Sequence, residues 1–231
     1  MIEKQRMIKD EEEIESIQKA CKVTDECFEY ILGYIKPGMT EKQIAREIDD
    51  YYYKNAEGTS FETIVASGEN SSKPHAVPTD RKIQEKDIIT IDMGCKIDGY
   101  CSDMTRTFFV GEIPEEMKKV YDLVLKNQVQ TLNDMREGYS TKMLAKMVDN
   151  DFRLNDYDLI HALGHGVGLD IHESPIISTR SENILKENMV VTDEPGIYIA
   201  GQFGIRIEDT VLITKGGCEA LTKSNKEYVV I

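Results

Sequence analysis

Three of the four histidines in this sequence lie within the thirteen residues His161–Glu173, which read HALGHGVGLDIHE. An imidazole can bind a metal ion, transfer a proton near neutral pH or donate a hydrogen bond to a substrate. The segment lacks the glutamate of the H-E-x-x-H zinc-protease helix, and its three glycines disfavour a helix of any kind. We therefore predict an extended segment that approaches a ligand closely, with His161 and His165 on one strand face and a bend that brings His172 round. A packing or surface role for each histidine is the alternative.

Two aspartates, Asp92 and Asp103, lie on either side of the turn sequence Asp98-Gly99 in a pattern typical of a β-hairpin. If the hairpin is centred just before Asp98, the two aspartates pair directly, with Cβ atoms about 5 Å apart. Like charges opposed in this way destabilise a sheet, and a bound metal ion would neutralise them. The alternatives are that one aspartate is protonated or faces solvent, or that Arg106 pairs with it.

The second half of the chain also has acidic residues on or beside apolar strands, namely Glu194 and Glu208 in VVTDEPGIYIAGQFGIRIEDTVLI. Strand alternation alone would turn Glu208 to solvent together with Arg206 and Thr210. Its correspondence with the Asp103 strand across an internal repeat favours an inward position instead.

The elements that must position these residues follow from hydrophobic periodicity and turn residues. Thr40 and Gln43 fit a capping box at the start of the second helix. We predict helices over residues of about 8–34, 41–54, 115–135 and 141–150, and strands over about 61–68, 189–193, 205–213 and 227–231, besides the hairpin. Helices that alternate with hairpins indicate an α+β fold, a curved antiparallel sheet flanked by helices.

An internal repeat relates the two halves. KPGMTEKQIAREIDD (36–50) and REGYSTKMLAKMVDN (136–150) are identical or conservative at ten of fifteen positions. We therefore expect one domain, residues 1–231, with pseudo-two-fold symmetry between repeats of about 8–110 and 114–215, and a pocket between them. His75 lies in a proline-stiffened loop, SSKPHAVPTD, before the acidic hairpin, and we expect it at the rim of that pocket.

Composition excludes several classes of partner. The 231 residues carry a net charge of −14 with a pI near 4.8, so nucleic acid and anionic membranes would be repelled. No apolar run is long enough to span a membrane, and the charged start is unlike a secretory signal. Five cysteines without a C-x-x-C pair favour a reduced, cytoplasmic protein in which they serve as small buried residues.

The segments IDMGCKIDGYCSDMTRTFFVG, HALGHGVGLDIHE, VVTDEPGIY and IRIEDT resemble the catalytic domain of Xaa-Pro aminopeptidases and prolidases. These are pita-bread metallopeptidases, a family that includes methionine aminopeptidases and creatinase. The resemblance covers essentially the whole chain and implies the pita-bread fold and two divalent metal ions. The implied ligands are Asp92, Asp103, His165, Glu194 and Glu208. Asp103 and Glu208 would contact both ions. This set, mostly oxygen with one imidazole, suits Mn²⁺, with Co²⁺, Zn²⁺ and Fe²⁺ as alternatives.

The resemblance also implies a reaction, hydrolysis of the bond between an N-terminal residue and proline by a metal-bridging hydroxide. Glu194 would carry the proton from water to the leaving nitrogen. His75, His161 and His172 would line the substrate site, with His75 and His172 as catalytic hydrogen-bond donors to the carbonyl oxygen. Arg206 would orient Glu208 or contact the substrate.

The segments SSKPHAVPTDRKI and SDMTRTFFVG favour the Xaa-Pro branch over a methionine aminopeptidase. The expected substrate is a short peptide with proline at the second position. Xaa-Pro peptidases usually carry a separate N-terminal domain, whereas this sequence begins where the catalytic domain would begin. We therefore expect a catalytic domain without that N-terminal domain. A homodimer and a non-catalytic or truncated binding module remain open.

Overall fold

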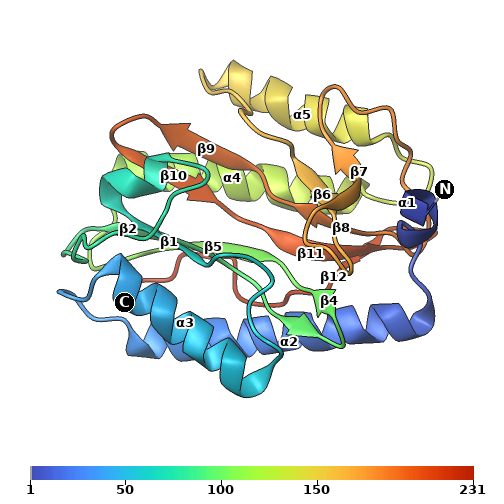
Figure 1. The fold of residues 1–231 in the computed structure, drawn as a ribbon. Helices are drawn as coiled ribbons and strands as arrows, with labels where there is room; N and C mark the ends of the chain where they lie inside the picture. Colours follow the sequence, from blue (N-terminus) through green and yellow to red (C-terminus); the bar gives the residue numbers. More distant parts are fainter. Residues whose placement is uncertain (1) are drawn as a thin grey trace.

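The computed structural model describes residues 2–231 of the chain. In Figure 1, α2 and α3 lie below the strands, α5 lies above them, and α4 passes behind. The helices are α1 (Ile2–Arg6), α2 (Glu11–Tyr34), α3 (Glu41–Asn55), α4 (Glu115–Asp134) and α5 (Thr141–Leu154). The four longer helices agree with the predicted ranges to within a few residues.

Capping boxes mark the starts of α2 and α3. Asp10 accepts from the backbone N–H of Glu13 at 3.0 Å, and Glu13 accepts from the backbone N–H of Asp10 at 2.8 Å. The capping box predicted for α3 is confirmed, because Thr40 and Gln43 make the same reciprocal pair of bonds. Each box satisfies two N–H groups that the helix itself leaves unpaired.

Antiparallel pairing organises all the strands into sheets of three (β1-β2-β5), five (β12-β11-β8-β6-β7) and two strands (β10-β9 and β3-β4). The strands are β1 (Ile64–Ser67), β2 (Ile88–Met93), β3 (Lys96–Ile97), β4 (Tyr100–Cys101), β5 (Met104–Phe109), β6 (Gly164–Gly166), β7 (Glu173–Ile177), β8 (Val190–Asp193), β9 (Gly196–Ile199), β10 (Phe203–Arg206), β11 (Asp209–Ile213) and β12 (Cys218–Ala220). A short 3₁₀ helix, η1 (Gly68–Ser72), follows β1.

Two large apolar clusters hold the helices to the strands. One joins α2 and α3 to β1, β2 and β5, and the other joins α4 and α5 to the strands of the C-terminal third. The backbone N–H of Glu208 donates to the carbonyl of Thr105 at 3.1 Å, so the two halves meet between β5 and β11. Helices therefore cover the outside of the strands, and a functional site can lie at the junction between the two halves.

The aligned segments 36–50 and 136–150 take the same local structure. Gly38 and Gly138 have positive φ values of 92° and 83°, and their N–H groups donate to Ile83 and Leu185. Positive φ is easily reached only by glycine, which explains why both copies of the turn contain it.

Two strand predictions were wrong. The range 205–213 is divided, because β10 pairs with β9 while β11 pairs with β8 and β12. The range 227–231 forms only a single bridge, between Val230 and Phe109. In the first case the chain changes sheet partner partway, which alternation of side chains does not reveal.

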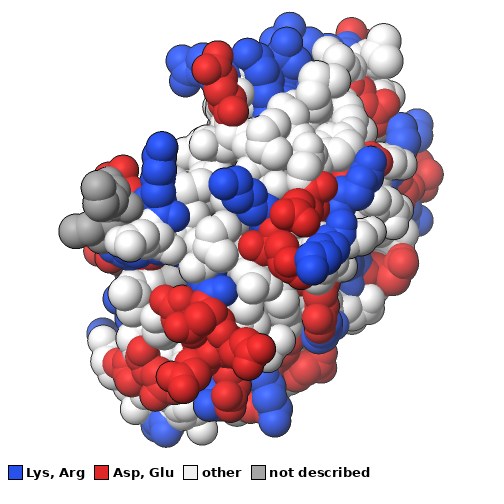
Figure 2. All heavy atoms as spheres, turned by 90° about the vertical axis from the view of Figure 1, so that its right-hand side faces the viewer, with Lys and Arg blue, Asp and Glu red and all other residues white. Residues whose placement is uncertain are grey.

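The acidic charge is spread in patches. Figure 2 shows acidic side chains gathered in the lower part of one face, where the start of α2 lies in Figure 1. The first turn of α2 holds Glu11, Glu12 and Glu13, where the helix dipole favours negative charge. Among the described residues, no helix is both long and apolar enough to cross a membrane.

Candidate active site

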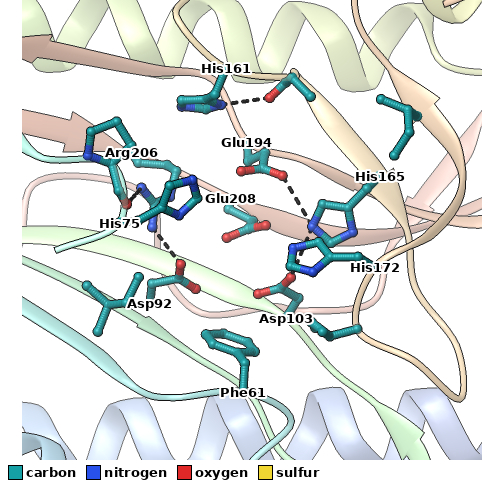
Figure 3. A pocket seen from close by; sticks show the side chains of 15 residues that line it. Phe61, His75, Asp92, Asp103, His161, His165, His172, Glu194, Arg206 and Glu208 are labelled. Carbon is teal, nitrogen blue, oxygen red and sulfur yellow. Dashed lines mark hydrogen bonds and ion pairs between the residues drawn. The ribbon is translucent and has the colours of Figure 1, made fainter. Parts of the chain in front are cut away.

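A cavity of about 250 Å³ opens between the two halves of the molecule, and Figure 3 shows the side chains that surround it. All nine residues that the sequence proposed for metal binding, catalysis or substrate contact line this one cavity. They are His75, Asp92, Asp103, His161, His165, His172, Glu194, Arg206 and Glu208. The remaining wall is mostly apolar: Phe61, Ile64, Pro74, Ala162, Ile171 and Ile176.

Asp92 and Asp103 reach the cavity from the hairpin, although the predicted direct pairing was wrong. Asp98 and Gly99 both have positive φ, 52° and 78°, and together form the two-residue turn. The pairing is therefore shifted by two residues, and Asp92 lies opposite Thr105. A shift of two preserves the sheet face, so Asp103 becomes a diagonal neighbour of Asp92.

Glu194 follows β8, and Glu208 lies in the break between β10 and β11. Glu208 is 1% exposed, which contradicts the solvent-facing position that regular alternation would give. Its carboxylate accepts a hydrogen bond from the Thr105 hydroxyl at 2.6 Å. The hydroxyl of Thr192 donates to Glu194 at 3.0 Å. Each glutamate is thus held by a threonine, Glu208 by one on β5 and Glu194 by one two residues earlier on β8.

The ligating atoms of Asp103, His165 and Glu208 all lie within 4.8 Å of one another. The Nε2 atom of His165 is 3.5 Å from Asp103 and 3.4 Å from Glu194. Asp92 Oδ1 is buried and has no hydrogen-bond partner within residues 2–231. A buried, unpaired carboxylate oxygen beside this group is the arrangement that a cation would complete.

The electrostatics of the cluster support the same conclusion. Burial raises the pKa of Asp103 well above its usual range, and the neighbouring carboxylates of Glu208 and Asp92 raise it further. Burial likewise raises the pKa of Glu208, aided by Glu194 and Asp92, and burial raises the pKa of Glu194. Several carboxylates buried close together are not readily ionised at once without nearby positive charge, because each ionised group raises the pKa of the next. The donor set therefore fits divalent cations.

The histidines take different positions around the cluster. His165 lies on β6 and is buried, and its ring meets that of His172 edge to face at 4.4 Å between centroids. His172 and His75 are exposed at the mouth of the cavity, as expected for His75. Burial lowers the pKa of His161 and His165, and the partial desolvation of the His172 ring lowers its pKa as well, which favours their neutral forms.

The predicted shared strand for His161 and His165 was wrong, because β6 spans only Gly164–Gly166. The glycines also serve a purpose other than the predicted approach to a ligand. A Cβ atom on Gly164 would overlap the carbonyl oxygen of Thr192 in β8, and one on Gly166 would overlap that of Ser174 in β7. They let β6 fit between two strands, which sets the position of His165.

Arg206 is buried and joins several parts of the site. Its Nη2 atom donates to Asp92 at 2.6 Å, its Nη1 atom to the carbonyl of Pro74 at 3.0 Å and the Tyr198 hydroxyl at 2.8 Å, and its Nε atom to Thr105 at 3.0 Å. The sequence prediction was that Arg206 orients Glu208 or contacts the substrate. In the structure Arg206 holds Asp92 directly and is linked to Glu208 through the Thr105 hydroxyl.

Sequence reasoning missed two residues of this network. The Tyr198 hydroxyl donates to Nε2 of His161 at 3.0 Å. Burial raises the pKa of Tyr198 to about 12, so its hydroxyl keeps the proton at neutral pH. Tyr198 lies four residues after Glu194, inside the segment VVTDEPGIY. Thr105 lies two residues after Asp103, so strand periodicity could have assigned it to the same face.

The expectation that Arg106 could neutralise the aspartates is wrong. Arg106 is 1% exposed and pairs with Asp209 at 2.7 Å, away from the cavity. It also donates to the backbone carbonyl of Glu208. Burial alone would raise the pKa of Asp209, but Arg106 and Lys226 together lower it. This ion-paired group anchors the chain on the far side of Glu208.

Residues 15–215 match the sequence profile of metallopeptidase family M24. A relative from Pyrococcus furiosus, named Xaa-Pro dipeptidase, is 42% identical over 228 residues, which cover 97% of this chain and 65% of the relative. The solved structure of an X-Pro aminopeptidase from Thermotoga maritima superposes with a TM-score of 0.97 at 41% identity, and the match covers all of this chain and 66% of that one. An Xaa-Pro dipeptidase from Bacillus anthracis gives a TM-score of 0.97 at 39% identity.

These likenesses confirm the predicted α+β pita-bread fold. The chain spans about two thirds of the length of the relatives that it matches, 65% to 66% for those above.

Proposed function

The chain belongs to metallopeptidase family M24, and from this premise we propose that it hydrolyses the peptide bond between an N-terminal residue and a following proline. The observation that carries the proposal is the convergence of four carboxylates and His165 on one cavity with an apolar wall. The names of two relatives, Xaa-Pro dipeptidase and X-Pro aminopeptidase, support this substrate class. The apolar wall beside the carboxylates is suited to the ring of a proline.

Five residues would hold two divalent ions: Asp92, Asp103, His165, Glu194 and Glu208. Mn²⁺ is the proposed metal, and it suits a mostly oxygen donor set with one imidazole, with Co²⁺, Zn²⁺ and Fe²⁺ as alternatives. Bound ions of this kind supply a nucleophile from water at neutral pH and stabilise negative charge on the attacked carbonyl oxygen.

Glu194 is the proposed proton carrier. The Thr192 hydroxyl donates to its carboxylate at 3.0 Å and fixes its orientation. A carboxylate held in this way can take a proton from water and return it to the leaving nitrogen.

The histidines at the mouth would bind the peptide. His75 and His172 are exposed there, and a neutral imidazole can donate one hydrogen bond to the substrate carbonyl. His161 has both ring nitrogens engaged, Nδ1 with the carbonyl of Ala162 at 2.7 Å and Nε2 with the Tyr198 hydroxyl. Because a carbonyl only accepts, Nδ1 carries the proton. His161 is therefore proposed as a wall of the substrate site rather than as a donor.

The test is hydrolysis of Ala-Pro and Ala-Pro-Ala peptides with added Mn²⁺ or Co²⁺, beside Met-Ala-Ser as the substrate of a methionine aminopeptidase. Asp103→Ala and Glu208→Ala should lose bound metal, measured by elemental analysis, and hydrolysis together. Full activity in either variant, or cleavage of Met-Ala-Ser alone, would contradict the proposal. Metal binding without turnover of any peptide would favour a binding module. Size-exclusion chromatography with light scattering tests whether the chain forms a homodimer.

A further inference from the structure

The loop from Ser67 to Thr79, which we call the His75 loop, carries one of the proposed donors to the substrate. It begins at the end of β1, includes η1 and returns beside β10. The backbone carbonyl of Pro74 accepts from Arg206 at 3.0 Å, and the hydroxyl of Ser71 accepts from the N–H of Gly204 at 2.9 Å. The position of His75 at the cavity mouth therefore depends on how this loop is held.

One buried carboxylate closes the loop. Glu41 is the first residue of α3 and is fully buried. One of its oxygens accepts from the N–H and hydroxyl of Ser67 at 2.6 and 2.7 Å. The other accepts from the side-chain amide of Asn70 at 2.9 Å and from the N–H and hydroxyl of Thr79 at 2.9 and 2.6 Å. Glu41 thus binds both ends and the middle of the His75 loop.

Five donors point at Glu41, which a carboxylate can satisfy and a neutral amide cannot. In a glutamine at this position, an NH₂ group would replace one of the two oxygens, and its two N–H groups would face the donors that this oxygen now accepts from. Hydrogen bonds to an ionised oxygen are about twice as strong as neutral ones. Burying a carboxylate without a direct cation is costly, so a glutamate here needs a reason beyond its favourable place in the first turn of a helix.

The other half of the molecule offers an internal comparison. Thr141 is the residue aligned with Glu41 at the start of α5 and is also fully buried. Its hydroxyl donates to the carbonyl of Asn183 at 2.9 Å and lies 2.8 Å from that of Ser181. Among the described residues, the Thr141 hydroxyl contacts only residues 181 and 183, at the far end of its loop and outside the cavity lining. The charged residue Glu41 instead binds both ends and the middle of the His75 loop.

We propose that Glu41 is a positioning residue for the peptidase reaction, acting through His75 by fixing the His75 loop. The inference rests on the proposed function, and it assigns Glu41 no contact with the substrate or the metal ions.

The test uses Glu41→Gln and the matched control Thr141→Val, each with and without His75→Ala. Glu41→Gln should lower kcat/KM for Ala-Pro at least about tenfold and leave the metal content unchanged. In the His75→Ala background the same change should lower kcat/KM less than about twofold, because its route of action has been removed. Thr141→Val should lower Tm but leave kcat/KM within about twofold. Equal factors in both backgrounds, or no loss of kcat/KM, would overturn the proposal.

Hydrogen exchange gives a readout independent of catalysis. In Glu41→Gln, the amides of Ser67 and Thr79 should exchange faster, while Thr141→Val leaves them unchanged. If the wild-type chain cleaves no Xaa-Pro peptide, the proposed function fails, and unchanged exchange in Glu41→Gln would separately overturn the loop anchor. If Glu41→Gln does not fold, Thr79→Val removes one of the five bonds and serves for both measurements under the same criteria.

Discussion

The Thr105 hydroxyl is a single buried group that joins the guanidinium of Arg206 to the carboxylate of Glu208. It accepts from Arg206 Nε at 3.0 Å and donates to Glu208 at 2.6 Å, and Thr105 is fully buried. Thr105→Val keeps the shape of the side chain but removes both bonds. A hydrogen bond to a charged group contributes about 1.5–3 kcal/mol, and a buried group left unpaired costs about 1–3 kcal/mol. We expect the free energy of unfolding to fall by about 2–4 kcal/mol.

The effect on catalysis should be larger than for an ordinary core threonine, because Glu208 loses the bond that fixes its orientation. If the bond stabilises the transition state by about 1.5–3 kcal/mol, losing it lowers kcat/KM about 10- to 150-fold. The assay is Ala-Pro hydrolysis with saturating Mn²⁺, with urea unfolding in parallel. The control is Thr90→Val, since Thr90 is also buried but bonds only to Thr107 and to the carbonyl of Gly204. A Thr105→Val enzyme with kcat/KM within about twofold of the Thr90→Val control would refute the reasoning.

Three further outcomes follow from the geometry. Tyr198→Phe should lower kcat/KM about tenfold without changing metal content, because His161 Nε2 and Arg206 Nη1 each lose a partner; an unchanged pH–rate profile and kcat/KM would contradict this. Gly164→Ala should lower the free energy of unfolding by at least about 1–3 kcal/mol in urea titrations, since its Cβ would overlap the backbone of β8. The gain in Tm on adding Mn²⁺ should grow as the pH rises from about 5 to 8. Without metal, the carboxyls with raised pKa favour folding while they are protonated, and this contribution is lost as the pH rises above their ordinary pKa; a cation binds the ionised forms and restores stability. A gain in Tm that does not depend on pH would argue against the metal cluster.

Periodicity and caps predicted the helices well, since each depends on residues close in sequence. Thr40 with Gln43 marked the start of α3, and the apolar spacing of α2 marked its buried face. The candidate site was predicted as a set, because the resemblance of separated segments assigned its residues together. What failed were the details that depend on pairing between distant strands.

Those failures have one physical cause. The hairpin register is set by positive φ at both Asp98 and Gly99, and moving the turn centre by one residue shifts each cross-strand partner by two. The burial of Glu208 depends on the chain leaving one strand partner for another at residues 207 and 208, which side-chain alternation cannot encode. Strand exchange and register are decided by tertiary contacts, so a single sequence leaves them open.

The register error changes the physical argument for a metal ion without removing it. Two directly opposed aspartates were expected to need a cation, yet Asp92 faces Thr105 and gains Arg206 as a partner through one of its oxygens. The repulsion instead involves carboxyls from both halves of the molecule. Burial and then Glu208 raise the pKa of Asp103, while burial and then Glu194 and Asp92 raise the pKa of Glu208. A cation at this place would therefore neutralise charge across the junction of the two halves and hold them together, which a hairpin site could not do.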